Sequence, residues 1–260
     1  MDRGPGVQLL AEAPVRASGR LEACLPQGSR RAPAPYRGYI IGVATPAKRH
    51  RSSQAVELEY DRIAHRYEHR WAHYVQATVS KTLAHLDLQP TMRLLDIGCG
   101  TGVLLREVER ACPGIAVVGI DVSRAMLTMA RRGLPQTTPL LRADAEELPF
   151  RTARFHVVVS SSSFHFWPNP SRALDEIARI LVPGGLLVLT DWCDDFLACR
   201  VWDRVLRVIN PAHQQIYSRD QCHALLSEHG YRVRALELYK VSWLWGMMTA
   251  SAVPEQPKGG

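Results

Sequence analysis

The stretch from residue 92 to residue 111 reads MRLLDIGCGTGVLLREVERA and combines three local patterns. Residues 92–97 are an apolar run typical of a short buried strand, a glycine-rich turn follows, and apolar residues then recur at helical spacing from Val103 onward. A strand, a glycine loop and a helix in this order open a nucleotide-binding α/β unit. The stretch therefore predicts an α/β fold in which the loop approaches a ligand.

The loop discriminates between two kinds of nucleotide. Gly98, Gly100 and Gly102 allow the backbone to turn tightly and to pass close to a ligand. The dinucleotide fingerprint requires Gly or Ala where this chain has Val103, and it requires no acid before the first glycine. Asp96 stands two residues before Gly98, where a carboxylate would repel a pyrophosphate but attract an ammonium and a sulfonium. The loop therefore favours a cationic ligand.

The DIGCGTG segment resembles the S-adenosylmethionine (SAM) binding motif of class I methyltransferases. The resemblance implies that the loop cradles the methionine end of the cofactor and that the acid helps to hold it. It also implies an α/β, Rossmann-like, doubly wound sheet of seven strands, mostly parallel with the last strand antiparallel, and helices on both faces. The cofactor contacts expected from the motif are Asp96, Gly98, Cys99, Gly100, Thr101 and Gly102.

Further contacts are expected along the chain. A second strand, residues 115–120, ends in Asp121, whose carboxylate would accept both ribose hydroxyls, and Ser123 is expected to cap the helix that follows. The resemblance places Asp144 and Ala145 beside the adenine, with Asp144 meeting its amino group. The other cofactor contacts predicted in this region are Val122, Met126 and Ser160, the last at the end of the fourth strand.

The rest of the chain has the order and spacing of small-molecule methyltransferases similar to ubiquinone- and menaquinone-biosynthesis enzymes, over residues 60–250. Ser171 is expected to cap a helix, residues 182–192 to supply a turn and a fifth strand, and Gly230 to stop a helix before another strand. Residues 242–252 are predicted to form the last, antiparallel strand. His156 is a departure, because those relatives usually carry Asp at this place.

An amphipathic helix is predicted from residue 57, ending near Thr78, where its apolar stripe weakens. Tyr60 and Tyr67 belong to that stripe, and an aromatic face near a sulfonium adds about 0.5–2 kcal/mol of cation–π attraction. We therefore expect this helix to be a lid and both tyrosines to contact the cofactor, although packing against the body also explains the stripe. The three histidines that recur every fourth residue, His65, His69 and His73, fall on the opposite, solvent face, so no metal site is expected.

Methyl transfer requires an acceptor aligned with the methyl group in a dry site. His165, after the fourth strand, is a candidate general base, and Asp191, at the end of the fifth strand, is a second. A histidine flanked by Phe164 and Phe166 also fits a plain wall residue. The acceptor pocket is expected under residues 192–217, whose Trp and Phe side chains suit an apolar or aromatic small molecule.

Charge and cysteine usage narrow the class of protein. Residues 1–53 carry nine basic and three acidic side chains, which leaves 23 basic and 22 acidic residues for the rest. This nearly neutral body gives no footprint for a phosphate backbone, so a nucleic-acid substrate is not expected. The six cysteines form no CxxC pair, which argues against a cysteine zinc site or a disulfide framework.

Three segments are predicted: a basic arm without regular structure at residues 1–53, a methyltransferase domain with its lid helix at 54–252, and a flexible tail at 253–260. No run is long and apolar enough for a membrane span, so a cytoplasmic enzyme is expected. The basic arm leaves a mitochondrial or plastid transit peptide open. We predict methylation of a small acceptor at O, C or N; the alternatives are an RNA-directed enzyme that uses the arm and a non-catalytic SAM-binding protein.

Overall fold

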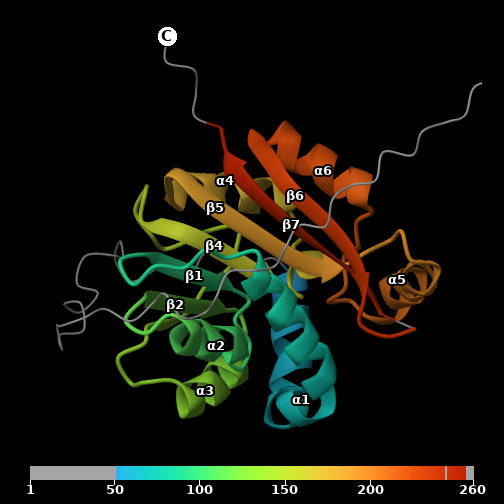
Figure 1. Ribbon diagram of the computed structural model, residues 1–260. Helices are drawn as coiled ribbons and strands as arrows, with labels where there is room; N and C mark the ends of the chain where they lie inside the picture. Colours follow the sequence, from blue (N-terminus) through green and yellow to red (C-terminus); the bar gives the residue numbers. More distant parts are fainter. Residues whose placement is uncertain (1–50, 244, 256–260) are drawn as a thin grey trace, which may run out of the picture.

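The computed structural model describes residues 51–243 and 245–255, which form one sheet flanked by helices (Figure 1). The predicted arm lies outside the described residues, except for its last three positions, where the first helix begins. In chain order the elements are α1 (Arg51–Ala84), β1 (Arg93–Ile97), α2 (Val103–Ala111), β2 (Ala116–Asp121), α3 (Arg124–Gly133), β3 (Leu140–Arg142), β4 (Phe155–Ser161), the short 3₁₀ helix η2 (Phe164–Phe166), α4 (Pro170–Ile180), β5 (Leu181–Trp192), α5 (Leu197–Ile209), α6 (Arg219–Glu228), β6 (Tyr231–Lys240) and β7 (Gly246–Pro254).

The seven strands lie in the order β3-β2-β1-β4-β5-β7-β6. β1 pairs in parallel with both β2 and β4, and β7 pairs antiparallel with both β5 and β6, so that β7 alone is reversed. The predicted fold class is confirmed. The chain crosses from β1 to β2 on one side and from β4 to β5 on the other, which makes the carboxyl ends of β1 and β4 the switch point where such sheets bind ligands.

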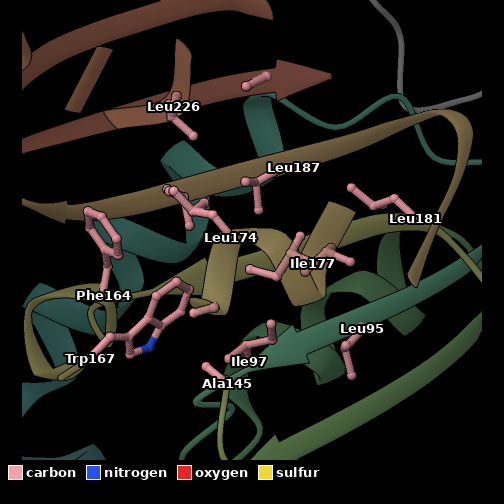
Figure 2. Close-up of a cluster of buried hydrophobic side chains, with 14 of the residues drawn as sticks. Leu95, Ile97, Ala145, Phe164, Trp167, Leu174, Ile177, Leu181, Leu187 and Leu226 are labelled. Atoms are coloured by element: carbon pink, nitrogen blue, oxygen red, sulfur yellow. The ribbon is translucent and has the colours of Figure 1, made fainter. Parts of the chain in front are cut away.

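Both faces of the sheet are buried, as a parallel sheet requires. Successive residues of β1 point to opposite faces: Leu94 packs with α1, α2 and α3, whereas Leu95 packs with the face covered by α4 and α6. Figure 2 shows this second core, in which Leu174 and Ile177 of α4 lie over the sheet. The helices on both faces hold the strand ends, and thus the loops above them, in fixed positions.

The first helix is longer than predicted. α1 continues through Thr78 to Ala84, with non-helical backbone at Trp71. Thr78 and Thr82 interrupt the apolar stripe without ending the helix, because their hydroxyls donate to main-chain carbonyls one turn back and Thr82 also bonds Thr190 of β5 (2.8 Å). The expected end near Thr78 was wrong because those hydroxyls find partners inside the fold.

Other boundaries follow local capping. Ser123 caps α3 as predicted, and Gly230 (φ 70°) follows α6 as predicted. The predicted Ser171 cap is wrong: Asn169 caps α4 and Pro170 occupies its first turn, a position where the missing N–H costs nothing. β7 extends to Pro254, so the predicted tail begins inside this strand and Val253 is buried.

In the described part of the chain, none of the helices combines the length and apolar character needed to cross a bilayer.

Candidate active site

The glycine loop connects β1 to α2 with three left-handed residues. Gly98, Gly100 and Gly102 have φ values of 73°, 54° and 78°. A Cβ on Gly98 would lie 2.5 Å from Ser163, and one on Gly102 would lie 2.8 Å from Leu134, whereas a Cβ on Gly100 would meet nothing within 4 Å. The backbone at Gly100 therefore borders open space, which is the geometry of a ligand cradle.

Asp96 lies at the end of β1 and is 2% exposed, yet its carboxylate has no hydrogen-bond partner among the described residues. Burial, and secondarily the charge of Asp121, raise the pKa of Asp96 to about 8. The hydroxyl of Thr101, beside it in the loop, is fully enclosed and also lacks a partner among the described residues. An ammonium group would supply the charge and the donors that this corner lacks.

Asp121, at the end of β2, holds the loop in place. Its carboxylate accepts the backbone N–H groups of Gly100 and Ser123, each at 2.8 Å. Burial raises the pKa of Asp121 to about 6, and these backbone donors partly oppose that rise. The carboxylate is therefore already oriented toward the loop, where the predicted ribose contact requires it.

Asp144 lies in the loop after β3, and its carboxylate accepts the hydroxyl of Ser53, from the first turn of α1, at 2.5 Å. The predicted partner of Asp144 was an adenine amino group, which would donate to the same carboxylate. The start of α1 therefore occupies a position that the ligand is expected to share.

These loops and α1 surround a cavity with two lobes, which we call the glycine-loop cavity. The lobes share Tyr67, Gly98 and Gly100. Predicted cofactor contacts that line the first lobe are Tyr60, Tyr67, Gly98, Gly100, Asp121, Val122, Met126, Asp144 and Ala145. Those that line the second lobe also include Asp96, Cys99 and Thr101.

Two predicted contacts do not line the cavity. Gly102 serves the fold, because it is the left-handed N-cap of α2. Ser160 is buried inside β4 and bonds Ser163 (2.9 Å), since the strand runs one residue further than expected. Ser162, which no sequence pattern indicated, takes its place beside the cavity with a positive φ of 59°. A positive φ in a residue other than glycine is uncommon, and such residues cluster at functional sites.

A second cavity, the aromatic cavity, lies between α1 and the segment from β5 to His213. Its walls include the predicted residues Trp192 and His165, together with Trp71, Trp202 and Trp245, and it shares Tyr67 and Ser162 with both lobes of the glycine-loop cavity. The Tyr74 hydroxyl joins the two sides, since it accepts the Trp192 indole N–H and bonds Ser162, both at 2.7 Å.

The two predicted catalytic residues form a pair in this wall. His165 Nδ1 lies 2.7 Å from Asp191 Oδ1, and both side chains are buried. Asp191 also accepts the backbone N–H groups of His165 (3.0 Å) and Trp192 (2.6 Å). Because the carboxylate needs donors, Nδ1 carries the proton, which leaves Nε2 of His165 as the basic nitrogen.

Sequence reasoning missed His213, which lies 5.5 Å from His165 between ring centroids and bonds Asp203 at 2.8 Å. The α1 histidines His65, His69 and His73 are exposed, as predicted. Within the described residues, no cluster of three or more His, Cys, Asp or Glu side chains could hold a metal ion.

Comparisons with known proteins agree with this geometry. Residues 95–189 match the methyltransferase domain family, so the predicted resemblance to class I SAM-dependent methyltransferases is confirmed. The fold matches the solved S-adenosylmethionine-dependent methyltransferase of Mesorhizobium loti with a TM-score of 0.59, 19% identity, and coverage of 67% of this chain and 96% of that one.

Curated relatives align with the same region. An uncharacterized methyltransferase of Mycobacterium tuberculosis is 45% identical over 98 residues, which are 37% of this chain and 38% of the relative. The demethylmenaquinone methyltransferase of Thermus thermophilus is 38% identical over 105 residues, 38% of this chain and 47% of the relative. The aligned part thus spans less than half the length of either relative.

Proposed function

We propose that the chain is a SAM-dependent methyltransferase that transfers a methyl group to a small apolar or aromatic acceptor. The observation that carries this proposal is the junction of the two cavities, because Tyr67 and Ser162 line both of them. A methyl donor in the glycine-loop cavity and an acceptor in the aromatic cavity would meet there. Such alignment is the main requirement of the reaction.

The residues present fit SAM. The unpartnered Asp96 carboxylate and the enclosed Thr101 hydroxyl would hold the ammonium end, and Asp121 would accept the ribose hydroxyls. Asp144 would accept the adenine amino group once Ser53 gives way. When bound, SAM supplies an electrophilic methyl group on a sulfonium.

Proton removal falls to His165 in this proposal. Asp191 already accepts three hydrogen bonds, so it orients the imidazole. Nε2 of His165 is the group able to take a proton from a hydroxyl of the methyl acceptor. Asp191 is therefore a positioning residue, in contrast to its predicted role as an alternative base.

An apolar acceptor is supported by the walls. Four tryptophans line the aromatic cavity, and Ile63 and Leu206 add aliphatic surface. Such surfaces bind flat apolar molecules. The name of the Thermus relative, which acts on demethylmenaquinone, is consistent with this class.

The test is an assay with methyl-labelled SAM and a panel of phenols, quinols and amines, using the full chain. We expect label in the organic extract with at least one acceptor, and His165→Asn should lower kcat by about 10²–10⁴-fold. His85→Gln is the matched control, since His85 lies outside both cavities and contacts Glu237. Binding of SAM without labelling of any acceptor would favour the non-catalytic alternative.

A further inference from the structure

We propose that the aromatic cavity selects aromatic acceptors with two hydroxyl groups on neighbouring ring carbons, of which one bonds His165 and the other His213. This inference rests on the proposed function, because it names the substrate class of the same site. The feature behind it is a second buried imidazole–carboxylate pair, which repeats the arrangement of His165 and Asp191 elsewhere in the wall of the same cavity.

The second pair is as firmly held as the first. His213 is 5% exposed and its Nε2 lies 2.8 Å from Asp203 Oδ1. Asp203, also buried, accepts the backbone N–H of Ile216 (3.0 Å) and pairs with Arg207 (2.7 Å). Because these groups require Asp203 as an acceptor, Nε2 of His213 donates to it, and Nδ1 keeps its lone pair.

The two imidazoles also share their walls. The His165 ring stacks on Trp192 with centroids 4.9 Å apart and an interplanar angle of 15°, and the His213 ring lies 6.3 Å from the same indole. The Phe166 ring centroid lies 3.9 Å from that of His165 and 6.5 Å from that of His213. This aromatic frame fixes the orientation of the imidazoles relative to each other.

The second nitrogen of each imidazole remains without a partner. His165 Nε2 and His213 Nδ1 have no hydrogen-bond partner among the described residues. In the described part of the chain, the side-chain atoms that are both fully enclosed and unpartnered are Thr101 Oγ1 and Arg154 Nε. The two imidazole nitrogens are therefore not fully enclosed. Both histidines line the aromatic cavity, where we place these two nitrogens as acceptors.

Two other polar groups of the cavity already have partners. Glu59 accepts the side-chain amide of Asn210 at 2.9 Å, and the Tyr74 hydroxyl bonds Ser162 and Trp192. Two imidazole nitrogens with free lone pairs suit a ligand that donates twice. Burial lowers the pKa of His213, which favours its neutral, accepting form. Two adjacent phenolic O–H groups on a flat ring meet both the donor requirement and the aromatic walls.

The roles of the two histidines differ in the transfer step. The hydroxyl bound to His165 would lose its proton to Nε2, and its oxygen would bond the methyl carbon that bound SAM would supply, with the carbon–sulfur electron pair remaining on the sulfur of the neutral thioether. The hydroxyl bound to His213 keeps its proton and fixes which oxygen is presented. The product is the monomethyl ether, and the proton on His165 is released to solvent.

The experiment compares a naphthalenediol with adjacent hydroxyls and the corresponding naphthol, titrated calorimetrically into the full chain saturated with S-adenosylhomocysteine. We expect the diol to bind at least tenfold more tightly. In His213→Phe the diol should bind only as tightly as the naphthol does to the same variant. The proposal would be overturned if the natural chain bound the diol and the naphthol with equal affinity, or if His213→Phe still preferred the diol.

A second measurement needs no substitution. In the natural chain with nitrogen-15-labelled histidine, the diol should shift the Nδ1 resonance of His213, and the naphthol should leave it in place. An unmoved His213 resonance at saturating diol would also overturn the proposal. Loss of the methyltransferase function itself would be visible separately, as absent binding of S-adenosylhomocysteine or absent methylation of the naphthol.

Discussion

At the scale of single residues, Asp96 is the proposed partner of the SAM ammonium group and contributes a part of the pH dependence of stability. Its pKa of about 8 lies far above the ordinary value of an Asp, so between about pH 4 and pH 8 the folded chain holds a proton that the unfolded chain releases. The folded state is therefore favoured by this group below pH 4, and that contribution is lost as the pH rises toward 8.

Asp96→Asn should consequently gain stability relative to the natural chain at pH 8 but not at pH 4. We expect a Tm increase of about 2–6 °C at pH 8, together with a loss of SAM affinity of about 100-fold or more, because the ammonium loses its counter-charge. Thermal unfolding at both pH values and calorimetry measure these effects. Asp87→Asn, at an exposed position, is the control. A variant that keeps its SAM affinity would contradict the assigned role.

Two loop glycines should respond differently to the same change. Gly98→Ala brings a Cβ within 2.5 Å of Ser163, so we expect a destabilisation of about 1–3 kcal/mol. Gly100→Ala meets no protein atom within 4 Å, and its left-handed backbone costs about 1–2 kcal/mol at most. Its methyl group should instead weaken SAM binding by tenfold or more. Denaturant unfolding and calorimetry on both variants test the contrast, which fails if Gly100→Ala binds SAM normally.

Residue patterns explain which site residues could be predicted. Asp96, Asp121 and the glycines stand in a continuous strand–loop–helix pattern, so their positions follow from local sequence. Asp203 lies on α5 and His213 in the segment after it, and neither belongs to such a pattern. They join the site only because His213 packs near His165 and Trp192. The positive φ of Ser162 is likewise set by the turn that follows β4.

At the scale of elements, α1 closes both cavities and is fastened by polar contacts at its amino-terminal half. Asp61 accepts the Ser123 hydroxyl at 2.5 Å and the backbone N–H of Ala125 in the first turn of α3 at 3.2 Å, while Glu57 forms an ion pair with Arg142. Ser53 bonds Asp144 nearby. This half of α1 also lines the glycine-loop cavity, through Ser53, Val56 and Tyr60.

We therefore expect SAM to slow hydrogen exchange in residues 53–67 more than in residues 79–84. Asp61→Ala should raise exchange in the same segment of the free protein and weaken SAM binding several-fold, because the contact to α3 is lost. Arg62→Ala, a neighbouring exposed position, is the control. Exchange in residues 53–67 that is unaffected by SAM would show that α1 is a fixed wall and not a lid.

Element boundaries show where sequence reasoning ends. The apolar stripe predicted α1, but its length depends on hydroxyl contacts of Thr78 and Thr82 with the helix backbone and with β5. The start of α4 was placed at Ser171 because serine is a common cap, whereas the Asn169–Pro170 pair supplies both a cap and a favourable first turn.

At the scale of the whole molecule, the doubly wound, seven-stranded sheet was predicted from the family resemblance that the glycine loop and the strands after it carry, and the strand order is seen only in the structure. The meeting of the two cavities could not be predicted, since it depends on how α1 lies across the carboxyl edge of the sheet. Each lobe draws residues from segments more than 80 positions apart, such as Tyr67 and Ser162.

The charge distribution gives a prediction at the same scale. Since residues 54–260 are nearly neutral, methylation of a small neutral acceptor should change less than about threefold between 50 and 200 mM salt, whereas a phosphate-backbone substrate would lose about 10³–10⁵ in affinity. Steady-state rates with the full chain at several salt concentrations check this. A steep salt dependence would favour the RNA-directed alternative.

The most direct test of the central claim is calorimetric titration of the full chain with SAM and with S-adenosylhomocysteine, beside the variant Asp121→Ala. The account predicts saturable binding of both ligands, at about micromolar affinity, and its loss in a variant that still unfolds cooperatively. Absence of binding by the folded natural chain, or equal binding by Asp121→Ala, would contradict the assignment of the glycine-loop cavity to SAM.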